Sequence, residues 1–172
     1  MSERPALPTA QAVWVAALLM VAGQVAFRGW ALHGSWFHTD DYRLLDDAQG
    51  APFTWSYLAT PFDSQLMPWG RAVAWVVAHS GQVDWSLAAT ITLTLQALAG
   101  LACVWMLVTL FGARWAVLAP LGLYLSSAIT MPAFMWWAAS LNQLPMQISF
   151  FAAVACWVHY ARSRRLAWLL LR

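Results

Sequence analysis

The residues of this chain that are best suited to chemistry lie close together, in the stretch 38–43 with the sequence HTDDYR. The chain has only seven acidic residues, and four of them are Asp40, Asp41, Asp46 and Asp47. A carboxylate at a membrane surface can act as a general base on an acceptor hydroxyl, or it can ligate a divalent cation. A low-dielectric setting raises the pKa of such a carboxyl, which suits a base that works near neutral pH. We therefore predict Asp40 and Asp41 as catalytic residues.

A structural role for the same residues is an open alternative. Asp40 could cap a short surface helix through its side-chain oxygen, with Asp41, Asp46 and Asp47 as solvated charges. Arg43 could pair with Asp46 or Asp47, which follow it by three and four residues on a helix. Two adjacent acids are compatible with either role.

Five further side chains are candidates for substrate binding. His38 could bind a phosphate or a metal, although a lone His in an aromatic loop also serves as a polar packing residue. Arg43 and Arg71 could bind a lipid phosphate. Asn142 and Gln143 could donate to a sugar hydroxyl, or they could cap a helix at a chain reversal.

The sequence contains few motifs for metals or cofactors. It has no Gly-rich phosphate loop, no Cys/His cluster, no nucleophile elbow and no HExxH. The sequence therefore makes no cofactor certain. A divalent cation remains an option, and Asp40 and Asp41 would be its ligands. The two cysteines, Cys103 and Cys156, each lie inside an apolar run and are interpreted as small buried residues.

The elements that must position these residues are membrane helices. The chain is 62% hydrophobic and 9% charged, whereas soluble domains contain about 25% charged residues. Because so small a number of charged residues cannot form a solvated surface, the composition predicts an integral membrane protein. Lysine is absent, and the nine basic residues are all arginines that flank apolar runs without forming a basic stripe. Nucleic acid is therefore not a predicted partner, whereas membrane lipid is.

The apolar runs predict an all-α fold, a polytopic transmembrane helix bundle in a single membrane domain, 1–172. The charge-free region from 115 to 161 would be about 70 Å long as one helix, against a hydrocarbon core of about 30 Å. It must therefore fold back once, and we expect the reversal in the Pro- and Asn-containing region 132–145. The predicted spans are 11–32, 85–111, 115–131 and 145–161, and 166–172 is the start of a fifth.

The first apolar run, 11–32, has a second interpretation. A basic start followed by an apolar core also fits a cleaved signal peptide. We favour a retained span, because the run is long and no clear small-x-small cleavage site ends it.

The interval 33–83 holds five of the seven acids and many aromatic residues. It is too aromatic for a disordered linker, so we expect a structured first loop. Its apolar segment 72–78 is too short to span, and it predicts a juxtamembrane helix near 70–79 that lies at the interface. Short loops rich in Arg stay in the cytoplasm, and the cluster 162–165 should dominate. The N-terminus is therefore predicted to be cytoplasmic in the cell membrane. The loop and the 136–145 reversal then lie on the extracytoplasmic face.

This arrangement resembles the N-terminal part of the GT-C superfamily of polytopic glycosyltransferases. The string His38-Thr39-Asp40-Asp41, placed after a first span, is similar to the acidic motif that those enzymes carry in their first outer loop. The juxtamembrane helix fits the same pattern, and the Arg- and Trp-rich composition without Lys resembles that of an actinobacterial protein. The resemblance implies transfer of a sugar from a polyprenyl-phosphate donor to a glycan or lipid acceptor. It also implies that Asp40 or Asp41 is the base and that His38 or an Arg lies near the donor phosphate.

Members of that superfamily have more spans and several hundred residues, so we expect this chain to be the N-terminal portion of a longer protein. If later spans complete the donor site, this portion is inactive by itself. The alternative function is that of a non-enzymatic multi-pass membrane protein, such as an accessory or assembly subunit. The Thr-containing face of the 85–111 span favours that alternative. A transporter is less favoured, because the spans after the loop carry no buried charge.

Overall fold

The computed structural model describes residues 10–81, 83–127 and 136–165. In these residues every regular element is helical, and the one pairing of extended residues is an isolated bridge between Phe62 and Gln65. The elements in chain order are α1 (Ala10–Leu32), α2 (Thr39–Gln49), α3 (Trp55–Leu58), α4 (Pro68–Ala78), α5 (Trp85–Phe111), η1 (Trp115–Val117), α6 (Leu118–Ser126) and α8 (Trp137–Ser163). The all-α class predicted from the sequence is confirmed for this part of the chain.

Three helices are long and apolar enough to cross a membrane, namely α1, α5 and α8. α1 and α5 correspond to the predicted spans 11–32 and 85–111. The boundaries of α5 follow from its flanks. Asp84 accepts a hydrogen bond from the backbone N–H of Ser86 (2.8 Å), and Gly112 ends the helix with φ 76°, in the left-handed region that favours glycine. These helices indicate a membrane protein.

The predicted third span differs from the structure. Residues 115–126 form η1 and α6, which together are shorter than a membrane-crossing helix, and residues 128–131 lie outside the described residues. A helix of twelve residues is about 18 Å long, against a hydrocarbon core of about 30 Å. A fourth span is therefore still a prediction, and the predicted start of a fifth, 166–172, also lies outside the described residues.

Helix α8 begins eight residues before the predicted span 145–161. The polar residues Ser140, Asn142 and Gln143, which were expected in a chain reversal, lie in its first turns, and Pro145 lies inside the helix. That placement of the reversal was wrong over residues 137–145. Proline is tolerated inside membrane helices because neighbouring groups can satisfy the backbone carbonyl that it leaves free.

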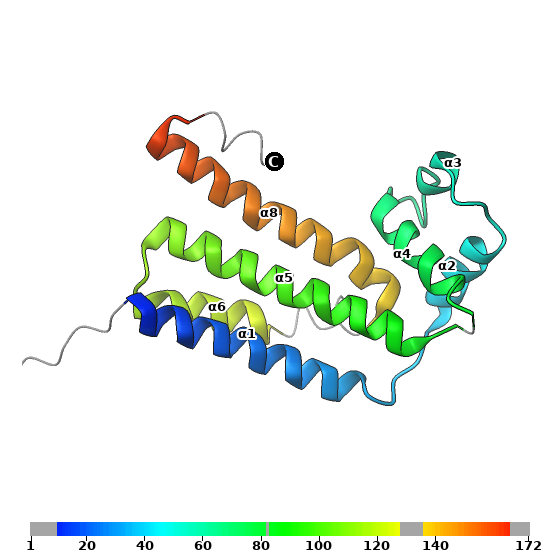
Figure 1. The fold of residues 1–172 in the computed structure, drawn as a ribbon, viewed down its shortest axis with the longest axis horizontal. Helices are drawn as coiled ribbons and strands as arrows, with labels where there is room; N and C mark the ends of the chain where they lie inside the picture. Colours follow the sequence, from blue (N-terminus) through cyan, green and yellow to red (C-terminus); the bar gives the residue numbers. More distant parts are fainter. Residues whose placement is uncertain (1–9, 82, 128–135, 166–172) are drawn as a thin grey trace, which may run out of the picture.

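Helix α5 is at the centre of the bundle, with α8 on one side and α1 and α6 on the other (Figure 1). α1 and α6 pack against the second half of α5 through an apolar cluster that includes Val13, Ala17, Val104 and Leu121. The helices α2, α3 and α4 form a separate unit beside the beginnings of α5 and α8 (Figure 1). We call it the loop unit.

The loop unit is built on its own apolar core, which continues into the bundle. α2 contributes Leu44 and α4 contributes Val77, and both pack in one cluster with Leu95 of α5 and Trp137 of α8. The predicted helix near 70–79 is α4, Pro68–Ala78, and its proline is in the first turn, where the missing N–H costs no hydrogen bond. The described residues of the loop 33–83 are therefore structured.

Candidate functional site

The first turn of α2 holds the predicted catalytic pair, and its two carboxylates have different surroundings. Asp41 is completely buried, with 0% of its surface exposed. The backbone N–H of His38 donates to Asp41 Oδ2 (2.8 Å), and the backbone N–H of Ala138 donates to Oδ1 (2.7 Å). The first bond closes the start of α2, and the second satisfies a free N–H in the first turn of α8. Asp41 therefore joins the N-termini of two helices.

The burial of Asp41 also determines its electrostatics. Burial raises the pKa of the Asp41 carboxyl above its ordinary value of 3.8, while the two backbone hydrogen bonds oppose that rise. The positive ends of the α2 and α8 dipoles favour a negative charge at this point. With both oxygens engaged and no exposed surface, this carboxylate has no direct access to a ligand.

Asp40 instead lines a pocket of about 140 Å³ between the loop unit and α8. Its side chain keeps about a quarter of its surface exposed. The other lining residues combine two aromatic side chains with polar groups from two distant parts of the chain. They are Phe62, Asp63, Gln65, Met67, Trp136, Ala138, Ala139, Asn142 and Gln143. Asp40, Asn142 and Gln143, which the sequence predicted as site residues, thus lie in one place.

Two further polar residues of the pocket, Asp63 and Gln65, were not predicted as site residues. They come from a tight turn in which Phe62 and Gln65 exchange backbone hydrogen bonds of 2.9 and 2.8 Å. Asp63 and Ser64, at the centre of this turn, have φ values of 43° and 66°. Residues other than glycine rarely adopt this left-handed region, and such strain, of order 1–3 kcal/mol each, often accompanies function. In the sequence, the only indication of this turn is the pair Asp63-Ser64 next to the aromatic Phe62.

The side-chain amide of Asn142 donates a hydrogen bond to the Oε1 atom of Gln65, which closes one wall of the pocket. This bond connects the turn at 62–65 to the second turn of α8. The pocket therefore depends on α8 beginning at Trp137, because a chain reversal at 136–145 would not carry Asn142 and Gln143 on a fixed helical surface.

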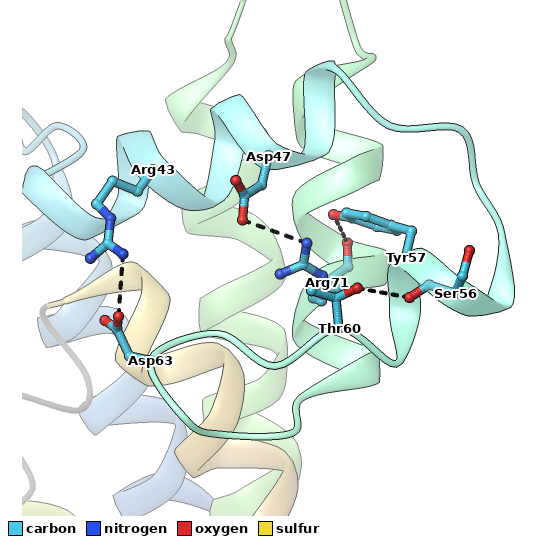
Figure 2. A network of polar contacts seen from close by, with 7 residues as sticks. All are labelled: Arg43, Asp47, Ser56, Tyr57, Thr60, Asp63 and Arg71. Carbon is cyan, nitrogen blue, oxygen red and sulfur yellow. Dashed lines mark hydrogen bonds and ion pairs between the residues drawn. The ribbon is translucent and has the colours of Figure 1, made fainter.

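Arg43 lies at the exposed rim of the pocket, and 60% of its side chain is accessible. Its Nη1 atom is 3.5 Å from Asp40 Oδ1. Its Nη2 atom donates to Asp63 Oδ1 at 3.3 Å, as Figure 2 shows. The suggested pairing of Arg43 with Asp46 or Asp47 was wrong. Arg43 instead contacts Asp40, one turn earlier on α2, because the turn at 62–65 folds against that end of the helix.

Arg71 is away from the pocket, in the interior of the loop unit. It is 3% exposed, its Nη2 atom is 3.6 Å from Asp47 Oδ2, and its guanidinium lies 4.4 Å from the centre of the Tyr57 ring. The hydroxyl of Tyr57 donates to the backbone oxygen of Arg71 (3.0 Å), as Figure 2 shows. Burial raises the pKa of Tyr57, although the charge of Arg71 opposes the rise. These contacts stabilise the packing of α2, α3 and α4.

His38 precedes α2, and its side chain is exposed outside the pocket lining. Among the described residues, no three His, Cys, Asp or Glu side chains gather as a metal site would require. The pocket contains two carboxylates, of Asp40 and Asp63. It also contains three carboxamides, of Gln65, Asn142 and Gln143. Such groups accept hydrogen bonds from hydroxyls and donate to them.

Comparison of the chain with models of known protein families, with curated proteins and with solved structures finds no match.

Proposed function

We propose that this chain is the N-terminal portion of a membrane glycosyltransferase of the GT-C type, and that an acceptor hydroxyl binds in the pocket beside Asp40. One observation supports this most: the Asp40 carboxylate shares a small pocket with the carboxamides of Gln65, Asn142 and Gln143. Ligand pockets usually measure about 300–1,000 Å³. A pocket of about 140 Å³ therefore suits part of a ligand, such as the hydroxyl edge of one sugar ring.

The reaction would use Asp40 as the general base. Its carboxylate takes the proton of the acceptor hydroxyl while that oxygen attacks the anomeric carbon of the donor sugar. The bond from that carbon to the polyprenyl-phosphate oxygen breaks, and the phosphate leaves with its electron pair. The exposed guanidinium of Arg43, at the rim of the pocket, is suited to bind the phosphate of the donor. Asp41 holds α2 against α8 and thereby positions Asp40.

The test measures sugar transfer from a polyprenyl-phosphate sugar to a glycan acceptor in membranes that contain the chain. Asp40→Asn should lower the rate by about 10²–10⁴, the usual contribution of a general base. Asp46→Asn, a matched change at an exposed position of the same helix, should leave the rate unchanged. A second readout, saturation-transfer NMR with free monosaccharides, does not require a complete donor site. Equal transfer by the Asp40→Asn variant, or no transfer together with no saccharide contact in the wild type, would contradict the proposal.

We further propose that the N-terminus is cytoplasmic and the pocket extracytoplasmic. The distribution of charge supports this orientation, because the Arg cluster at 162–165 lies at the end of α8 that is remote from the loop unit (Figure 1). Both native cysteines are buried and free, so a single introduced cysteine can report its side. Ser64→Cys should react with a membrane-impermeant maleimide in intact cells, and Ser163→Cys should react only after lysis. The reverse pattern would contradict this orientation.

A second candidate function is that of an accessory subunit without catalytic activity. The observation in its favour is that α1 and α8 are mostly uncovered. In the most apolar 18-residue stretch of each helix, only 17% of the residues of α1 and 22% of those of α8 are buried within the protein. Faces of this kind can pack against the helices of another membrane protein. A chain that is stable and monomeric in detergent, and that captures no partner after cross-linking in membranes, would count against this function.

A further inference from the structure

The end of the bundle remote from the loop unit carries positive charge. Arg114 follows α5, and Arg162, Arg164 and Arg165 lie at the end of α8. The side-chain carboxylates of the described residues are all at the opposite end, in the loop unit or at the start of α5, and the sequence contains no acid after Asp84. This end therefore has a positive field that no described carboxylate neutralises.

The arginines at this end have different roles. The Nη1 atom of Arg162 donates to the backbone oxygen of Thr109 (2.6 Å), and its Nη2 atom donates to that of Leu110 (3.3 Å). These are free carbonyls in the last turn of α5, so Arg162 is a helix cap. Arg114 is exposed, and within the described residues its guanidinium has neither a hydrogen bond nor an ion pair. Arg114 is therefore available to a ligand.

Arg114 lines a pocket of about 580 Å³ where the chain turns from α5 into η1 and α6. The other lining residues are apolar: Leu110, Phe111, Ala116, Val117 and Pro120. Phe111 and the neighbouring Trp115 are about half exposed, and exposed aromatic residues at the end of a span are typical of the membrane–water interface. One free cation thus lies beside an apolar pocket and exposed aromatic residues, at the end of a helix that is long and apolar enough to cross a membrane.

We infer that this pocket binds an anionic phospholipid of the bilayer, with the lipid phosphate on Arg114 and an acyl chain along Leu110, Val117 and Pro120. Two features favour a lipid over a soluble anion. The pocket offers a single cation and an otherwise apolar wall, which suits a phosphate that is joined to a hydrocarbon chain. It also opens beside interfacial aromatic residues instead of in a polar cleft. The site is independent of the proposed glycosyl transfer, because it is at the other end of α5.

The experiment titrates the detergent-solubilised full chain with phosphatidylglycerol and, separately, with phosphatidylcholine, and counts the bound lipids by native mass spectrometry. The wild type should retain phosphatidylglycerol more strongly. Arg114→Gln should weaken that binding about five-fold, the factor that corresponds to about 1 kcal/mol for one arginine near an anionic surface. Arg114→Lys should retain most of it. Ala116→Trp, which keeps the charge but fills the pocket, should also lose it.

Arg165→Gln is the matched control, because it removes an exposed arginine at the same end of the molecule that does not line the pocket, and it should bind phosphatidylglycerol like the wild type. The helical content of each variant is compared by circular dichroism. The inference is overturned if Arg114→Gln binds phosphatidylglycerol as well as the wild type does, or if phosphatidylcholine binds equally tightly. It is also overturned if soluble glycerol phosphate displaces the lipid, since the ligand would then be a soluble anion.

Discussion

The carboxylate of Asp41 accepts a hydrogen bond of 2.7 Å from the backbone N–H of Ala138, a residue 97 positions later in the chain. This bond crosses from the loop unit to the start of α8, and it is completely buried. It places the first turns of α2 and α8 side by side, so that Asp40 on one helix and Asn142 on the other line the same pocket. The geometry of the candidate site therefore depends on Asp41.

Replacement of Asp41 should destabilise the protein strongly. Asp41→Ala leaves the buried N–H of Ala138 and the part-buried N–H of His38 without acceptors, and a buried group without a partner costs about 1–3 kcal/mol. Unfolding of the detergent-solubilised chain by SDS, followed by circular dichroism, measures this loss. Asp46→Ala, at an exposed position of the same helix, should change the stability by less than about 0.5 kcal/mol. Equal stabilities of the two variants would show that the Asp41 bonds contribute nothing.

The same carboxyl should make the stability depend on pH. Because burial raises its folded-state pKa above the ordinary 3.8, the folded protein holds this proton at pH values where the unfolded chain has released it. The stabilising contribution is complete below about 3.8 and is lost as the pH rises through the folded-state pKa. Asp41→Asn cannot titrate, so the stability of the wild type relative to this variant should fall as the pH rises from 3.8. Melting curves from acidic to neutral pH measure this difference, and a rise with pH would refute the assignment.

The packing of α1 on α5 should be sensitive to one added methyl group. A Cβ at Gly100 would lie 2.9 Å and 3.1 Å from the two γ-carbons of Val21, and overpacking of this kind costs about 1–3 kcal/mol. Gly100→Ala should therefore lower the stability, and the double variant with Val21→Ala should recover part of the loss. Gly23→Ala is the control, because nothing lies within 4 Å of a Cβ at that position. A neutral Gly100→Ala would mean that the two helices are further apart than described.

Replacement of Arg43 should weaken binding of the sugar donor and should hardly change the free energy of unfolding. With 60% of its side chain exposed, its ion pairs to Asp40 and Asp63 should contribute at most about 1 kcal/mol. Arg43→Gln should therefore unfold like the wild type within that margin. In the transfer assay it should raise the KM for the polyprenyl-phosphate sugar, with a smaller effect on kcat. A fall in kcat at unchanged KM would instead place Arg43 in the chemical step.

Asn142 should be needed for saccharide binding. Asn142→Ala removes both a lining carboxamide and the hydrogen bond to Gln65. The loss of one such bond to a ligand, about 1 kcal/mol, weakens binding about five-fold. Saturation-transfer NMR with a monosaccharide measures the change. Gln147→Ala, further along α8 and outside the pocket lining, should bind like the wild type, and equal weakening in both variants would point to a general loss of α8 structure.

The sequence by itself was sufficient for the class of protein and for several elements. Long uncharged runs have few stable alternatives to membrane helices, because backbone groups in lipid must be hydrogen-bonded internally. That reason explains why the predicted 85–111 coincides with α5, and why 11–32 lies within one residue of α1. The segment predicted as a helix near 70–79 is helical, as α4, because its apolar residues must be buried somewhere, whereas its place at a membrane interface stays a prediction. None of these predictions required knowledge of a distant contact.

The tertiary structure alone decided the start of α8 and the distant groups that each of the two adjacent aspartates meets. Pro145 and the polar residues before it have a local preference for a turn, but Trp137 is buried in the core of the loop unit, and Asp41 caps the helix there. The local pattern places Asp41 at the capping-box position of α2 and on the same helix face as Leu44 and Ala48, but it does not show that Asp41 meets Ala138 or that Asp40 lines a pocket. Their surroundings differ because the Asp41 side chain bonds to Ala138 and the Asp40 side chain lines the pocket. Asp63 and Gln65 joined that pocket through a strained turn whose conformation no hydrophobic periodicity encodes.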